Sequence, residues 1–98
     1  MSPKLGVLAL LEAKPGKGDD LGKFLEAGRE LAAAEPGTVT WSAFKITDTQ
    51  YGIFDTFEDD GGRQAHLDGQ IPAALSQVAE ELLATAPDIR TVDVLAVK

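Results

Sequence analysis

The residues best suited to acid–base chemistry lie in the stretch YGIFDTFEDDGGRQAHL, Tyr51 to Leu67, which holds the chain's only tyrosine and only histidine. His66 is suited to accept and return a proton, because an imidazole titrates near neutral pH. Asp55 lies inside an apolar run, where a carboxylate needs a partner, and Arg63, Arg90 or His66 could be that partner. We interpret His66 and Asp55 as candidate catalytic residues. His66 would assist proton transfer, and Asp55 would orient His66 or the substrate.

Both residues also have ordinary structural explanations. A lone histidine on a short helix is more often a packing or capping residue than a catalyst, and a buried aspartate is often half of an ion pair. The observation that decides between these readings is whether His66 faces Asp55 or faces water.

The composition excludes several other kinds of chemistry. The chain has no cysteine, so thiolate nucleophiles and disulfides are excluded. One histidine with scattered carboxylates is a poor metal ligand set, and no glycine-rich phosphate loop follows a strand, so we expect no metal and no cofactor. The net charge of −7, with nine scattered basic residues, disfavours nucleic-acid partners and anionic membrane surfaces.

The N-terminal apolar run, Leu5 to Leu11, is too short to span a membrane and is not followed by a signal-like cleavage site. Together with the absence of cysteine, this favours a cytoplasmic protein.

Hydrophobic periodicity predicts the elements that must position these residues. The expected strands cover residues 4–14, 38–46, 50–58 and 89–97, and the expected helices cover about 20–35, 62–68 and 71–85, with Asp19 or Asp20 capping the first helix. This order predicts a single α+β domain over residues 1–98. Its fold would be a ferredoxin-like split βαβ sandwich, with helices on one face of a four-stranded antiparallel sheet.

The TDT loop between the two middle strands determines which side chains share a face. If Ile46 lies opposite Tyr51, one set of residues faces the helices, and we expect it to bind substrate: Tyr51, Phe57, Phe44, Ser42 and Ile53. An apolar set would then cover the opposite face: Trp41, Phe54, Leu8 and Leu10. We expect this second face to be the interface of a homodimer, with Trp41 more often an interface than a pocket residue. A slip of one residue would exchange the two faces.

Three stretches resemble the antibiotic-biosynthesis-monooxygenase family of dimeric α+β barrels. They are LEAKPGKGDDLGKFLEAGRELAAAEPGTVTW, YGIFDTFEDDGGRQAHL and VDVLAVK. The resemblance implies this fold, a homodimer, and a cofactor-independent monooxygenase acting on an aromatic, quinol-like or polyketide-like small molecule. The alternative is a non-enzymatic dimeric module of the same fold that binds a small ligand or has a stress-related role.

The chain departs from the family's pattern at several positions. Phe57 stands where family enzymes often have tryptophan, and Asp55 where they often have glutamate. The haem-degrading branch uses an asparagine near the position of Ala9 and a histidine in the later helix. This chain has no asparagine and no histidine between Ile71 and Thr85, so the resemblance does not extend to haem degradation.

Overall fold

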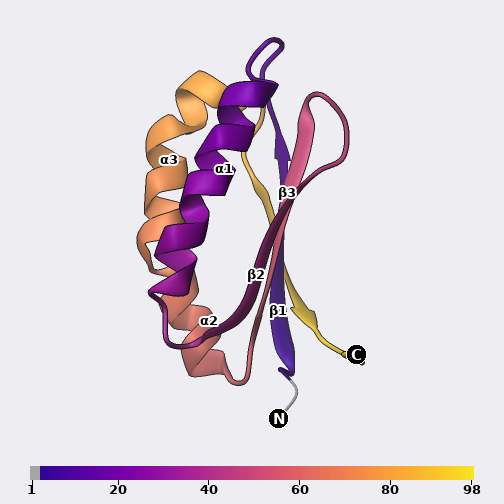
Figure 1. Ribbon diagram of the computed structural model, residues 1–98, viewed down its shortest axis with the longest axis vertical. Coiled ribbons are helices and arrows are strands. Elements are labelled where there is room, and N and C mark those ends of the chain that lie inside the picture. The colour runs from indigo at the N-terminus through magenta and orange to yellow at the C-terminus, as the bar shows by residue number, and fades with distance from the viewer. Residues whose placement is uncertain (1–2) are drawn as a thin grey trace.

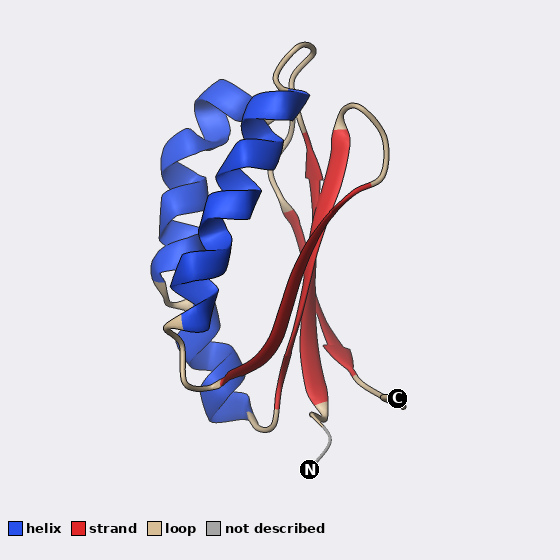
Figure 2. Ribbon diagram, in the orientation of Figure 1, coloured by secondary structure: helices blue, strands red, loops and turns tan. Residues whose placement is uncertain are grey.

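The computed structural model describes residues 3–98, which form a four-stranded antiparallel sheet with three helices against one face (Figure 1). The elements are β1 (Leu5–Glu12), α1 (Gly18–Ala33), β2 (Thr38–Lys45), β3 (Gln50–Phe57), α2 (Asp60–Leu67), α3 (Gln70–Leu82) and β4 (Asp88–Asp93). The strands lie in the order β2-β3-β1-β4. Figure 2 shows every helix on the same side of the sheet. The predicted ferredoxin-like α+β fold is confirmed.

The short helix α2 begins at Asp60, two residues before the expected start, and Asp59 caps it. The Asp59 side chain accepts a hydrogen bond of 2.9 Å from the backbone N–H of Gly62. The predicted cap of α1 is wrong, since that helix already begins at Gly18 and has no side-chain cap. Asp19 and Asp20 lie in its first turn instead, where their charge favours the positive end of the helix.

Side chains of the two central strands lie on the predicted faces. On β3, Tyr51, Ile53, Asp55 and Phe57 face the helices and are buried, because each pairs with an inward-facing residue of β1. The core beneath the helices is built from small and branched side chains of both layers: Ala9, Leu11, Leu21, Leu25, Ile53, Leu75 and Leu83. This core fixes the sheet face on which any enclosed site must lie.

The register of β2 differs from the prediction by one residue. The backbone N–H of Ile46 donates a 2.8 Å hydrogen bond to the carbonyl oxygen of Gln50, so the TDT loop closes between these two residues. Lys45, and not Ile46, therefore lies opposite Tyr51. Because side chains alternate along a strand, this slip exchanges the two faces of β2.

The predicted faces of three β2 residues are consequently wrong. Ser42 pairs with Phe54 and Phe44 pairs with Gly52, so both lie on the open face of the sheet. Trp41 lies on the helix side, where its ring packs against Gly28 of α1. A Cβ added to Gly28 would lie 3.4 Å from the Trp41 ring. Trp41 is therefore not part of the open face.

A β-bulge interrupts β2 near its beginning. Thr38 pairs with Phe57 and Thr40 pairs with Thr56, which leaves Val39 as an extra residue. Thr38 and Thr40 consequently point to opposite faces although they are two residues apart. Thr40 contacts Thr56 on the open face through their hydroxyl oxygens, which lie 2.6 Å apart.

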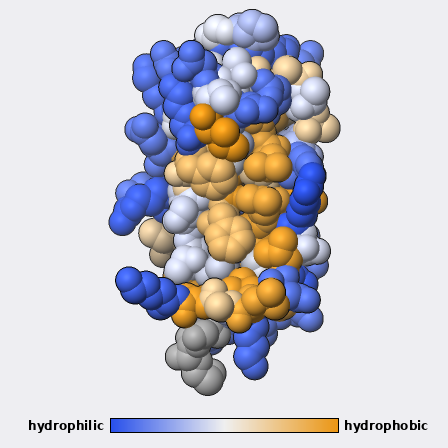
Figure 3. Space-filling model, turned by 90° about the vertical axis from the view of Figure 1, so that its right-hand side faces the viewer, coloured by the Kyte–Doolittle hydropathy of each residue, from blue (hydrophilic) through white to orange (hydrophobic). Residues whose placement is uncertain are grey.

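The open face of the sheet carries an apolar band that no element covers (Figure 3). Leu8, Leu10 and Phe54 lie on it half-buried, and Phe44 is 38% exposed. The predicted placement of Leu8, Leu10 and Phe54 on this face is correct. Among residues 3–98, no helix is both long enough and apolar enough to cross a membrane.

Candidate functional site

His66 is held between two carboxylates in the interior of the protein. Its Nε2 lies 2.8 Å from Oδ2 of Asp55, and its Nδ1 lies 2.7 Å from Oε1 of Glu35. His66 is 6% exposed and the Asp55 side chain 1%, whereas the Glu35 side chain is 21% exposed. The question left open by the sequence is answered: His66 faces Asp55 and not water.

Three separate elements bring this group together. Asp55 projects from β3 toward the helices, His66 lies in the last turn of α2, and Glu35 lies in the connection that follows α1. The ring of Phe57 packs against the imidazole with centroids 5.4 Å apart. The group therefore ties the end of α1 and the end of α2 to the sheet.

Glu35 is itself held in place by its neighbours. The hydroxyl of Thr38 donates a 2.8 Å hydrogen bond to Oε1, the same oxygen that contacts His66. The other oxygen of Glu35, Oε2, lies next to Gly69, and a Cβ added to that glycine would be 3.2 Å from it. A carboxylate fixed in this way can keep one tautomer and one orientation of the His66 ring.

The charges around His66 raise its pKa above the ordinary value of 6.5. Burial is the largest single influence and lowers the pKa, but the hydrogen bonds and charges of Asp55 and Glu35 together outweigh it. In the charged form both ring nitrogens carry a proton, so His66 donates to both carboxylates at once.

Stability should therefore depend on pH through His66. A raised folded-state pKa means that the charged ring contributes stability that is complete below pH 6.5 and is lost as the pH rises through the raised pKa. We expect the free energy of unfolding of the wild type, measured by urea titration across a pH series, to fall above pH 6.5. The glutamine in the variant His66→Gln does not titrate, so this decrease of the free energy of unfolding with pH should be absent. The same pH dependence of the free energy of unfolding in both proteins would contradict the role given to His66.

One oxygen of the buried group has no partner. Both nitrogens of His66 and the Oδ2 of Asp55 are engaged, but Oδ1 of Asp55 is buried without any hydrogen bond. Chemically, this arrangement holds a proton on an imidazole and keeps a carboxylate oxygen available beside it. Within residues 3–98, no group of three or more acidic or histidine side chains is arranged to hold a metal ion.

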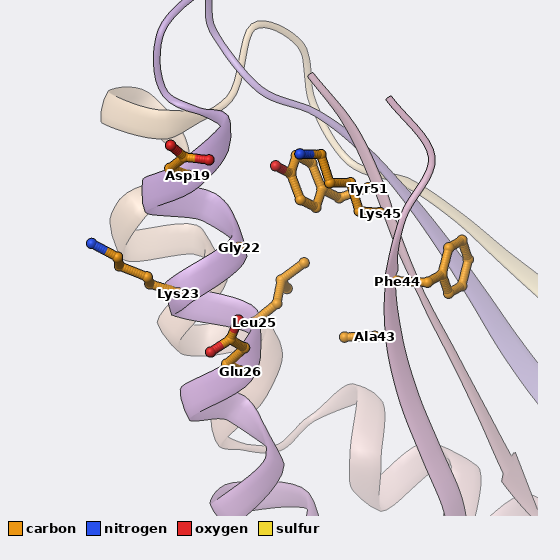
Figure 4. Close-up of a pocket in the computed structure, with 9 residues that line it drawn as sticks. All are labelled: Asp19, Gly22, Lys23, Leu25, Glu26, Ala43, Phe44, Lys45 and Tyr51. Atoms are coloured by element: carbon orange, nitrogen blue, oxygen red, sulfur yellow. The ribbon is translucent and has the colours of Figure 1, made fainter. Parts of the chain in front are cut away.

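A pocket of about 400 Å³ lies between α1 and the β2–β3 hairpin (Figure 4). Figure 4 shows the side chains of Lys45 and Tyr51 next to each other, both directed from the strands toward α1, with Leu25 projecting from the helix. Phe44 points to the other side of the sheet. Ala43 and Gly22 complete the apolar wall, and charged residues of α1 line the rim: Asp19, Lys23 and Glu26.

The structure divides the predicted site residues into separate groups. His66, Asp55 and Phe57 lie together, whereas Tyr51 lines the 400 Å³ pocket and Ile53 lies in the core. The side chains of Ser42 and Phe44 lie on the wrong face to reach a ligand beneath the helices.

Sequence reasoning missed two residues of this region. Glu35 has no local signature, because it meets His66 only when the end of α1 is placed beside α2. Trp41 could have been placed by treating TDT as a loop of three residues, which sets Ile46 opposite Gln50.

Comparison with solved structures places the chain among proteins of one architecture. A protein of unknown function from Nitrosomonas europaea, NE2512, is 48% identical and has a TM-score of 0.96, with 98% of this chain and 93% of that chain covered. The chain belongs to the family of NE2512. No family model matches the sequence, and no curated protein does.

Less similar solved structures with the same fold carry names that state a function. A "putative antibiotic biosynthesis monooxygenase" from Caulobacter crescentus is 21% identical, with a TM-score of 0.79 over 96% of this chain and 92% of that one. A second protein of that name, from Nitrosomonas europaea, is 12% identical, with a TM-score of 0.83 over 94% and 99% of the two chains. The NE2512 family thus has the fold of the antibiotic biosynthesis monooxygenases, and the resemblance noted in the sequence is confirmed at the level of the fold.

Proposed function

We propose that the protein is a cofactor-independent monooxygenase that acts on an aromatic, quinol-like or polyketide-like small molecule. The observation that carries this proposal is the buried His66, held between Asp55 and Glu35 beneath the helices. The shared fold of proteins named as antibiotic biosynthesis monooxygenases supports it.

The proposed reaction makes few demands on the protein. A deprotonated quinol is electron-rich enough to reduce O₂ itself, so the protein must bind the ring, take up its proton and exclude water. With a hydroquinone, one oxygen atom enters the ring and the other leaves as water, and the ring becomes a hydroxyquinone. The substrate supplies all four electrons, which is why no cofactor is required.

The buried group suggests how the proton is handled. Both nitrogens of His66 are already engaged, so we assign the first proton transfer to the unpartnered Oδ1 of Asp55. His66 holds Asp55 through Oδ2, and Glu35 holds His66 in turn. In this assignment Asp55 is the catalytic base, and His66 and Glu35 are positioning residues, which exchanges the roles that the sequence led us to expect for His66 and Asp55.

Oxygen uptake tests the proposed function. We expect purified protein to consume O₂ with at least one member of a panel of hydroquinones and anthrones, faster than buffer alone. Asp55→Asn should lower that rate at least about 100-fold, the usual range for a general base. Gln64→Ala, an exposed change on the same helix as His66, is the matched control and should leave the rate unchanged. Uptake no faster than in buffer across the whole panel would reject the proposal.

A second candidate function is a non-enzymatic module that binds a small ligand. It is favoured by one observation, because the 400 Å³ pocket is not lined by His66 or Asp55. In the same panel, saturable binding without O₂ uptake would support this candidate.

We also propose that the protein is a cytoplasmic homodimer whose two sheets stack through their open faces. The apolar band of Leu8, Leu10 and Phe54 supports this, and the paired charges of Arg90 and Asp88 lie beside it on β4. An apolar centre with a polar rim is typical of a protein interface. The absence of cysteine fits a reducing compartment.

A further inference from the structure

Two buried side-chain polar atoms among residues 3–98 have no hydrogen-bond partner, and they are complementary. One is Nε1 of Trp41, which can only donate, and the other is Oδ1 of Asp55, which accepts when the carboxylate is ionised. Trp41 and Asp55 lie directly opposite each other on β2 and β3, on the helix side of the sheet. Unpaired buried polar groups are rare in folded proteins, so two of them on directly paired residues point to a missing partner.

A single hydroxyl group matches both atoms. Its oxygen can accept the hydrogen bond from Nε1 of Trp41, and its hydrogen can be donated to Oδ1 of Asp55. A methyl or an unsubstituted ring position can do neither. The other oxygen of Asp55 is held by His66, which fixes the carboxylate in place.

The surroundings of Trp41 are apolar and not fully packed. A cavity of about 80 Å³ lies beside its ring, lined by apolar residues of α1 and α3: Phe24, Leu25, Ala27, Gly28, Leu31, Ile71 and Ala74. Leu25 also lines the 400 Å³ pocket, so this residue borders both spaces. Ala43, in the wall of the larger pocket, is two strand residues from Trp41, or roughly 7 Å.

We propose that Trp41 and Asp55 form a hydroxyl-binding pair for a small phenolic ligand. The ligand enters through the 400 Å³ pocket, displaces the side chain of Leu25, and places its ring between α1 and β2 with the hydroxyl toward the pair. The inference rests on the proposed function for its ligand class. It adds the orientation of the ring and the residue that recognises the hydroxyl oxygen.

Isothermal titration with two isosteric probes tests the pair. Phenol and toluene have nearly the same shape, but only phenol carries a hydroxyl. We expect the wild type to bind phenol at least about tenfold more tightly than toluene, because a site built for a hydroxyl discriminates against an analogue without one. No detectable phenol binding, or equal affinity for the two probes, would overturn the proposal.

Two variants separate the polar contact from simple packing. Trp41→Phe keeps an aromatic ring but removes the N–H, and should reduce the preference for phenol about fivefold to tenfold. Phe24→Leu changes the same cavity without touching a polar atom, so it should alter both affinities together and leave their ratio unchanged. An unchanged ratio in Trp41→Phe would contradict the proposal.

The phenol-binding and oxygen-uptake experiments test the two proposals separately. A phenol preference without O₂ uptake would sustain the hydroxyl-binding pair and reject the monooxygenase. Uptake with hydroquinones but no phenol preference would reject the pair alone.

Discussion

Replacing His66 by alanine should lower the free energy of unfolding by about 3–5 kcal/mol at pH 6, which is the usual cost of removing one partner from a buried ion pair. The change leaves Oδ2 of Asp55 and Oε1 of Glu35 without their shared donor. The effect on Asp55 is the more serious one, because its side chain is 1% exposed and its carboxylate would lose the group that compensates for its burial. The alanine also removes the ring that packs on Phe57.

Urea unfolding at one fixed protein concentration measures this effect, and the fluorescence of Trp41, the only tryptophan, can report it. Gln64→Ala is the matched control, since Gln64 lies exposed on the same helix and its side chain donates a hydrogen bond to Asp68 at the surface. It should cost less than about 0.5 kcal/mol. A loss below about 1 kcal/mol for His66→Ala would mean that the two carboxylates do not depend on the imidazole.

Replacing Leu8 by aspartate should convert the proposed homodimer into a monomer. Leu8 lies on β1, a central strand, and pairs with Phe54 on one side and Arg90 on the other, so it is near the middle of the open face. In a two-fold symmetric interface each substitution occurs twice, so two carboxylates would have to be buried within the same apolar contact. Light scattering coupled to gel filtration should show the mass of two chains for the wild type and of one chain for Leu8→Asp.

Ile89→Asp is the control for this experiment. Ile89 is also an exposed apolar residue, but it lies on the edge strand β4 and pairs with Ala9, so it points to the helix side of the sheet. Its replacement should leave the dimer intact. Circular dichroism of Leu8→Asp should retain the wild-type helix and strand signals. A wild-type mass of one chain would reject the proposed stacking of the sheets.

Much of the fold follows from local patterns in the sequence. The alternation along β3 groups Tyr51, Ile53 and Phe57 on one face, and that face is the buried one, whereas β1 is apolar at nearly every position and shows no such alternation. The contact between Asp55 and His66 was one of three pairings that the sequence left open for Asp55. It forms because the helix that follows β3 directly passes back over the inward side of that strand.

The register of β2 could not be inferred so securely. This strand lies at the sheet edge and is apolar on both faces, so the burial pattern offers little preference between two registers that differ by one residue. The hydrogen bond between Ile46 and Gln50 decides it. Glu35 was inaccessible for another reason: it is 31 residues from His66 in the chain, and only tertiary packing brings them together.

The extra residue at Val39 has a consequence for comparing this chain with its relatives. Thr38 reaches Glu35, and Trp41 packs under α1, so both face inward although they are an odd number of positions apart. A regular strand cannot do this, because its side chains alternate strictly. A homologue lacking one residue here can preserve the threonine contact or the tryptophan contact, but not both. In a sequence alignment, a one-residue gap at this point of β2 therefore marks a homologue that has lost at least one of the two contacts.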